Sequence, residues 1–221
     1  MTTTSEHREL GLRERKKQRT RELIAETARR MFVERGFEHV TVAEIARAAE
    51  VSEKTVFNYF PTKEDLVYWR LESFEEELLA AVRERAVGES ILSAFGRFVL
   101  KRRGMLAQED PEAVEQLAAL TRMITESPAL LARERHVFER YTSSLAALIA
   151  DETGASADEA EPRVAATAMM GVHRALIDYA RRRIVAGARN PGLQREVRAQ
   201  GRRALGLLER GLGSYGIKAA D

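Results

Sequence analysis

Apolar side chains recur at helical spacing along most of the 221-residue chain, and no segment shows the alternation typical of a β-strand. Capping residues, glycines and prolines set the bounds of the predicted helices. We expect nine helices, over residues 15–35, 42–49, 53–60, 63–86, 89–105, 111–125, 128–152, 159–187 and 191–212. The pattern therefore predicts an all-α protein.

Prolines and glycines support these bounds. Each of the five prolines lies near a predicted helix beginning. Pro128 follows Ser127 and Pro191 follows Asn190, so a capping residue precedes proline at the first helical position. Gly36 suits the left-handed position that closes the first helix.

The chain length suits a small domain fused to a larger one. We expect the first domain to cover residues 1–66, with three helices, and the second to cover residues 67–221. The boundary then falls inside the fourth predicted helix, which both domains would share.

Residues 41–63 carry the clearest functional pattern. Thr41 caps the second predicted helix, and Glu44 three residues later completes a capping box. Ser52 caps the third helix after a tight turn, and a further helix follows. Val56 and Phe60 are four residues apart and should anchor the third helix in a small core. This layout is that of a helix-turn-helix DNA reader.

The opposite face of the third helix carries Glu53, Lys54, Phe57 and Asn58. Asn58 can bond the major-groove edge of an adenine, and Phe57 can pack on a thymine methyl group. Thr55 and Tyr59 carry hydroxyls suited to phosphate oxygens, and Lys63 adds charge at the next helix beginning. The predicted DNA contacts are Arg13, Lys16, Lys17, Thr41, Ser52, Lys54, Thr55, Phe57, Asn58, Tyr59 and Lys63.

The net charge is only +2, but basic residues concentrate just ahead of the reader. Residues 13–21 hold six basic side chains and one acid, Glu14. Such a basic arm suits a phosphate or minor-groove contact. The alternative is a solvated terminus.

The reader segment resembles the TetR family of bacterial repressors. The similarity covers roughly residues 17–67 and lies in Ala28, Phe32, Gly36, Phe37, Thr41, Ile45, Ala46, Val51, Ser52, Thr55, Phe57, Tyr59, Phe60, Lys63, Glu64 and Leu66. The resemblance implies a nine-helix fold, with an N-terminal helix-turn-helix domain and a helical ligand-binding and dimerisation domain. It also implies a homodimer on a palindromic DNA operator, released by a small-molecule inducer.

Two positions depart from that family's pattern. Glu50 occupies the tight turn, where the family often has glycine; a non-glycine residue in left-handed geometry costs about 1 kcal/mol. Phe57 stands where the family usually has tyrosine, so the phosphate-bonding hydroxyl is missing. Phe57 can therefore offer only apolar contact.

By the same resemblance, the helices between residues 89 and 187 would enclose the inducer, and those over 159–187 and 191–212 would pair in the homodimer. The candidate pocket residues are Phe95, Phe98, Met123, Phe138, Tyr141, Met169 and His173. Such apolar stripes are also what an ordinary core requires, and both interpretations stay open. We expect the basic run 181–183 to be a solvated helix end.

Other functions find little support. The chain has no cysteine, no glycine-rich phosphate loop and no nucleophile elbow, and its four histidines are scattered, so we expect no enzyme, metal or cofactor. No apolar run is long enough for a membrane span, and a reducing cytoplasm fits. The alternatives are an activator, a helical binding module that has lost DNA binding, and, remotely, a helical enzyme.

Overall fold

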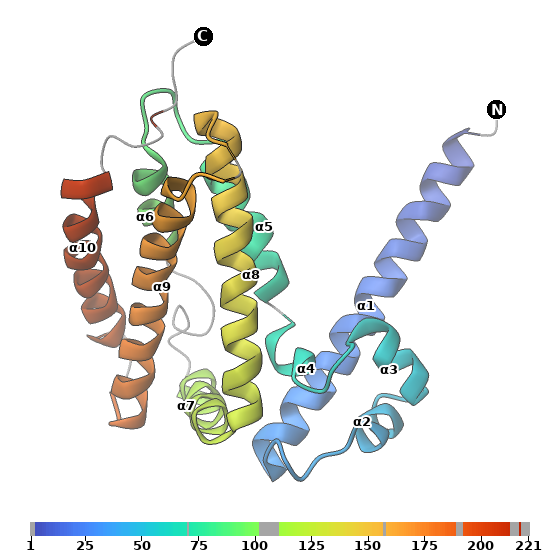
Figure 1. Cartoon of the computed structure of the whole chain (residues 1–221). Coiled ribbons are helices and arrows are strands. Elements are labelled where there is room, and N and C mark those ends of the chain that lie inside the picture. The colour runs from blue at the N-terminus through green and yellow to red at the C-terminus, as the bar shows by residue number, and fades with distance from the viewer. Residues whose placement is uncertain are drawn as a thin grey trace. The chain divides into compact units, whose positions relative to one another are not determined.

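The computed structural model describes residues 3–69, 71–101, 111–156, 158–188, 192–212 and 217 (Figure 1). These residues form ten helices and one isolated antiparallel bridge, between Ser90 and Ile217, so the chain is all-α as predicted. It divides into an N-terminal unit, Met1–Arg70, and a C-terminal unit, Leu71–Asp221.

The N-terminal unit contains α1 (Thr3–Arg35), α2 (Val42–Ala48), α3 (Glu53–Tyr59) and α4 (Asp65–Tyr68). Helix α1 packs against α2 and α4, and α2 packs against α3. Side chains of α1 and of the rest of the unit form a small core, in which Met31 is half-buried. The fully buried members are Ile24, Ala28, Phe32, Phe37, Val40, Ile45, Val56, Phe60 and Leu66.

The predicted start of the first helix, near residue 15, is wrong. Helix α1 begins at Thr3 and continues without interruption to Arg35. Glu, Arg and Leu, which have good helix propensity, make up seven of the twelve residues from 3 to 14, and apolar periodicity, on which the prediction depended, is weak there. The basic segment is therefore helical. Gly36 closes α1 with a φ of 84°, as expected.

The C-terminal unit contains α5 (Leu71–Arg83), α6 (Ile91–Val99), α7 (Pro111–Glu126), α8 (Pro128–Thr153), α9 (Glu161–Val185) and α10 (Gly192–Leu212). Helices α8, α9 and α10 lie side by side in Figure 1, with α9 in contact with both neighbours. Helix α7 packs on α8 and α9, and α6 packs on α5 and α10.

The single helix predicted over residues 63–86 is instead two helices, α4 and α5, which accounts for ten helices in place of nine. Trp69 keeps right-handed helical dihedral angles, with φ −56° and ψ −31°, and Arg70 lies outside the described residues. Continuous apolar spacing across the segment gave no indication of this division.

Three of the four described prolines mark helix beginnings, whereas Pro61 lies four residues before α4. Pro111 and Pro128 are the first residues of α7 and α8, and Ser127 accepts a hydrogen bond from the backbone N–H of Leu130. Pro162 is the second residue of α9, while Pro191 lies outside the described residues. Proline there needs no N–H partner, so it fixes the start without loss.

One expectation about surface charge is wrong for one residue. Arg181, in the basic run 181–183, donates to Glu134 of α8 at 2.8 Å, and the side chain of Glu134 is almost fully buried. Arg183 donates to Glu196 of α10 at 2.9 Å, which lowers the pKa of that carboxyl. Arg181 therefore joins α9 to α8 away from solvent, whereas Arg182 is exposed and the pair of Arg183 with Glu196 stays partly exposed, as expected for a helix end.

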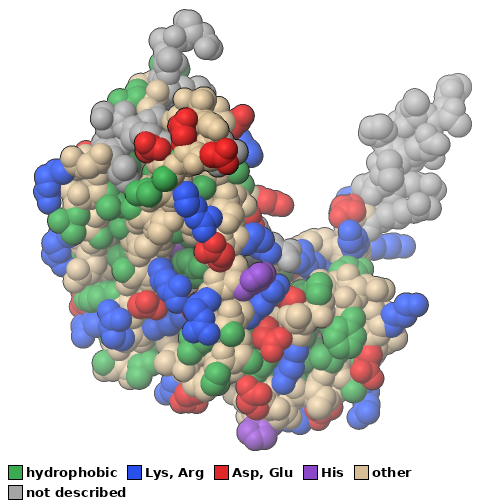
Figure 2. Space-filling view, viewed as in Figure 1, with side chains coloured by type: hydrophobic (Ala, Val, Ile, Leu, Met, Phe, Trp, Pro, Cys, Tyr) green, Lys and Arg blue, Asp and Glu red, His purple; other side chains and the backbone are tan. Residues whose placement is uncertain are grey.

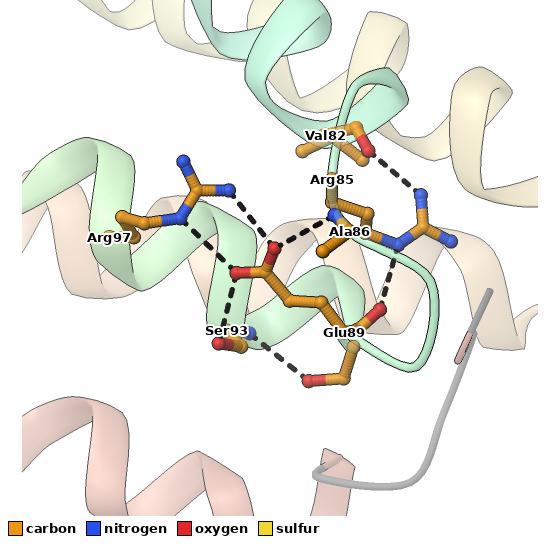
Figure 3. Close-up of polar contacts among 7 residues, drawn as sticks. Val82, Arg85, Ala86, Glu89, Ser93 and Arg97 are labelled. Carbon is orange, nitrogen blue, oxygen red and sulfur yellow. Dashed lines mark hydrogen bonds and ion pairs between the residues drawn. The ribbon is translucent and has the colours of Figure 1, made fainter.

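A second polar network joins the end of α5 to the start of α6 (Figure 3). The buried Arg85 donates to the carbonyls of Val82 and Glu89, at 2.8 and 3.1 Å, and also to Glu152 of α8. The Glu89 carboxylate accepts from Arg97 at 3.1 Å and from Ser93 at 3.2 Å. The bond from Arg97 is the main cause that lowers the pKa of Glu89. This turn is thus held by charged hydrogen bonds as well as by packing.

None of the helices in the described parts of the chain is long and apolar enough to cross a membrane.

Candidate nucleic-acid interface

The beginning of α2 is fixed by a reciprocal pair of hydrogen bonds. The backbone N–H of Thr41 donates to Glu44 at 2.8 Å, and the Thr41 hydroxyl accepts from the Glu44 N–H at 3.3 Å. This is the capping box that the sequence predicted, and it satisfies two donors that a helix start would otherwise leave unpaired.

Arg35 at the end of α1 extends this cap, a contact that the sequence analysis missed. Its guanidinium donates to Glu44 at 2.7 Å and to the carbonyl of His39 at 3.1 Å. The hydrogen bonds from Thr41 and Arg35 lower the pKa of Glu44 to about 2. Glu44 is therefore ionised near pH 7 and forms a partly exposed ion pair between α1 and α2.

Helix α3 is capped by Ser52, as predicted. The Ser52 hydroxyl accepts from the Thr55 N–H at 3.1 Å and shares a hydrogen bond with the Thr55 hydroxyl at 2.8 Å. The two expected anchors, Val56 and Phe60, are each only 1% exposed. The orientation of α3 is therefore fixed at both ends.

Anchoring Val56 inward leaves the opposite face of α3 open. Its four predicted reader side chains are all exposed: Glu53, Lys54, Phe57 and Asn58. Phe57 is 47% exposed, although it is a large hydrophobic side chain. Thr55 and Tyr59 are half-buried. A short helix with one anchored and one open face can enter a DNA major groove.

The turn between α2 and α3 contains the predicted left-handed residue. Glu50 has a φ of 54°, the only positive value at a non-glycine residue in the described chain. The turn is closed by hydrogen bonds from Val51 N–H to the Ala46 carbonyl, at 2.9 Å, and from Glu50 N–H to that of Arg47, at 3.2 Å. These bonds hold Glu50 in a conformation that its side chain disfavours.

Lys63 lies over aromatic rings of the small core. Its ammonium is 4.2 Å from the ring centroid of Phe37 and 5.8 Å from that of Phe32. Partial burial lowers its pKa. The structure thus gives Lys63 a cation–π contact inside the unit, and its predicted phosphate contact stays a prediction.

Basic side chains of the predicted arm lie on α1. Lys16 and Lys17 are exposed, and the Lys17 ammonium is 3.9 Å from Glu14; Arg13 lies outside the described side chains. Figure 2 shows basic and acidic side chains interspersed over the face in view. The charge of the face in view is therefore mixed.

Five of the seven candidate pocket residues lie in one apolar core of the C-terminal unit. Phe95, Phe98, Phe138, Tyr141 and Met169 are buried together there, and Met123 is half-buried on α7. Phe74 of α5, which the sequence analysis missed, lies at the centre of an aromatic cluster. Its ring centroid is 5.2 Å from that of Phe98 and 5.5 Å from that of Tyr141. Its four-residue spacing from the buried Leu78 could have indicated it.

His173 of α9 completes the aromatic cluster. Its ring stacks on Phe74, with centroids 4.6 Å apart and planes at 11°, and Phe138 lies 5.6 Å away. Burial among these rings lowers the pKa of His173 to about 4. The imidazole is therefore neutral near pH 7, with one donor and one acceptor nitrogen in apolar surroundings.

An anchored helix-turn-helix with an open reader face, followed by a larger helical unit, defines a DNA-binding regulator. Two family models match the chain: bacterial regulatory proteins of the tetR family over residues 24–68, and the MftR C-terminal domain over residues 90–212. The chain belongs to the tetR family of transcriptional regulators and has an MftR-like C-terminal domain. This is a family of regulators and not of enzymes.

Individual regulators and a solved structure are similar to this chain. The chain is 33% identical over 151 residues to the transcriptional regulator TcmR of Streptomyces glaucescens, 67% of each chain. It is 24% identical over 166 residues to a protein of Mycobacterium tuberculosis named as the mycofactocin biosynthesis regulator MftR, covering 72% of this chain and 78% of that one. The solved structure of the SmeT–triclosan complex shares the fold, with a TM-score of 0.52 and 16% identity over 86% of this chain and 90% of that one.

Proposed function

We propose that this regulator is a ligand-responsive repressor, which binds a palindromic DNA operator as a homodimer and is released by a small molecule. The observation that carries the proposal is the open face of α3, where Lys54, Phe57 and Asn58 project from a helix anchored by Val56. Asn58 reads a base edge, because its amide can donate to and accept from one adenine.

The remaining predicted contacts suit the phosphate backbone. Thr41 and Ser52 lie at the beginnings of α2 and α3, and Thr55 and Tyr59 flank the reader face with hydroxyls. Lys16, Lys17 and Arg13 precede them on α1, and Lys63 follows. Phosphate contacts of this kind fix the register of the reader without specifying sequence.

Helices α9 and α10 supply the proposed dimer surface. Val164 of α9 and Leu207 of α10 are 60% and 66% exposed. Gly171 of α9 has no atom within 4 Å of the place where a Cβ would lie, which leaves room for a second helix. An exposed apolar surface with small residues suits burial against a second copy.

The aromatic cluster around Phe74 and His173 is the proposed ligand site. Aromatic side chains and Met169 pack together there; the flexible Met169 can rearrange around an apolar molecule, and neutral His173 offers one polar contact. The two reader helices of a dimer must reach grooves about 34 Å apart, so a ligand that changes their separation weakens specific binding.

Random-site selection with the full chain tests this function, followed by titration of the enriched duplex. We expect an inverted repeat whose half-sites are centred about one helical turn apart. Asn58→Ala should weaken that duplex about tenfold or more while the dimer stays intact in sedimentation. The matched control is Ser143→Ala, an exposed residue of α8, which should leave affinity unchanged. Enrichment of no duplex would overturn the proposal and favour a binding module without DNA recognition.

A further inference from the structure

Phe57 is the one aromatic side chain that the helix-turn-helix leaves in solvent. The other phenylalanines of the described N-terminal unit, Phe32, Phe37 and Phe60, are at most 4% exposed, whereas Phe57 is 47% exposed. Exposed phenyl surface is unfavourable in water. A binding partner that covers the ring would recover this free energy.

The geometry of α3 places Phe57 beside one particular neighbour. Successive helical residues are rotated by about 100°, so with Val56 pointing inward Lys54 and Asn58 lie at the centre of the outer face. Thr55 and Tyr59, with their hydroxyls, lie on one flank. Glu53 and Phe57, one turn apart, form the other flank, which we call the Glu53–Phe57 flank.

The chemistry of the Glu53–Phe57 flank excludes a phosphate contact. A carboxylate repels phosphate, and a phenyl ring has no hydrogen-bond donor. Base edges therefore suit this flank better than phosphates when α3 lies in the groove. In the major groove, the C5 methyl group is the apolar feature that distinguishes thymine from the other bases. The N4 amino group of cytosine can donate a hydrogen bond to a carboxylate.

We propose that Phe57 is a specificity-determining residue that packs on the C5 methyl group of a thymine in each half-site, with Glu53 excluding phosphate from its flank. The proposal rests on the operator binding proposed above and deepens it. Glu53 is then a discriminating residue and not a sign that DNA binding is lost. Cytosine methylated at C5 presents the same methyl group and should substitute for this thymine in the contact.

The test uses the full chain and the duplex enriched by random-site selection. Each thymine is replaced singly by deoxyuridine, which removes only the methyl group, and affinity is measured by fluorescence anisotropy. One position per half-site should weaken binding about threefold to fivefold, as expected for one buried methyl group. The other replacements should change affinity less than twofold.

Two variants assign the effect to the ring. Phe57→Ala should bind the thymine duplex more weakly and lose its preference for thymine over deoxyuridine at that position. Asn58→Ala, the matched control on the same helix, should bind weakly but keep this preference. Circular dichroism should show unchanged helix content for Phe57→Ala, because the side chain is exposed.

Three outcomes overturn the inference in distinguishable ways. If no single deoxyuridine replacement lowers the affinity, the methyl contact is refuted while operator binding stands. The same holds if the wild type and Phe57→Ala prefer thymine over deoxyuridine to the same degree. An enriched DNA motif that has no thymine in its half-sites also refutes the methyl contact but not operator binding. If no duplex is enriched at all, the proposed function fails together with the inference.

Discussion

The two units use polar side chains in different ways. In the N-terminal unit, the side-chain hydrogen bonds that shape the reader join residues close in sequence: three apart in the caps of Thr41 and Ser52, and nine apart between Arg35 and Glu44. In the C-terminal unit, Arg181 reaches Glu134 across 47 residues, and Arg85 reaches Glu152 across 67. Local caps fix the helix ends of the reader, while long-range ion pairs join the helices of the larger unit around its apolar core.

This difference has an energetic consequence. The caps are exposed, so losing one costs about 1 kcal/mol and affects one helix end. The pair of Arg181 and Glu134 is largely buried, and removing one partner leaves an uncompensated charge away from water. Substitutions in the C-terminal unit should therefore cost more stability than comparable changes in the reader.

The largest effect is expected for Arg181→Met. The substitution keeps most of the apolar stem but leaves Glu134 buried without its guanidinium partner, so the free energy of unfolding should fall by roughly 3 kcal/mol. Urea denaturation followed by circular dichroism measures this loss. Arg182→Met, the exposed neighbour, should change stability by less than about 0.5 kcal/mol. Equal midpoints for the two variants would show that the pair does not stabilise the unit.

A somewhat smaller effect should come from His173 as the pH falls. Its pKa is about 4 in the folded state, below the ordinary value of 6.5, so the unfolded chain binds more protons between these pH values. Stability should therefore fall as pH is lowered from 6.5 to 4, by roughly 2 to 3 kcal/mol for this group. Denaturation midpoints measured across this range test the sign.

A pair of variants isolates that contribution. His173→Phe should flatten the pH dependence between 6.5 and 4, because an uncharged ring then occupies the stack with Phe74. His136→Gln removes an exposed histidine of α8 and should leave the slope unchanged. A slope that persists in His173→Phe would assign the pH dependence to other groups.

The reader could be predicted from the sequence because its contacts are local. Thr41, Glu44 and Ser52 form the caps that their spacing indicated, and Val56 and Phe60 are buried as their four-residue separation required. The left-handed conformation of Glu50 was indicated instead by the family resemblance, because related chains often have glycine at this position of the turn. In each case the partners lie within one or two helical turns.

The C-terminal unit could be predicted only as helices with apolar stripes. Arg181 was expected in solvent because nothing near it in sequence identifies Glu134 as its partner. The spacing of Phe74 from Leu78 could have marked it as an inward residue, but not its ring contacts, because Tyr141 and His173 come from α8 and α9. Tertiary packing determines which helix faces contact each other, and the spacing of residues in a single sequence does not predict those contacts.

The smallest effect tests whether the reader stores strain at Glu50. With a φ of 54°, this residue has a Cβ in left-handed geometry, so Glu50→Gly should raise the stability of the N-terminal unit by about 0.5 to 1 kcal/mol. Trp69, the single tryptophan, lies in this unit, and its fluorescence follows urea unfolding there. Glu50→Ala removes the same charge but keeps the Cβ, so it should not stabilise the unit. If both variants gain equally, the charge of Glu50 and not its backbone conformation opposes folding; if neither gains, the closing hydrogen bonds of the turn tolerate the left-handed residue without strain.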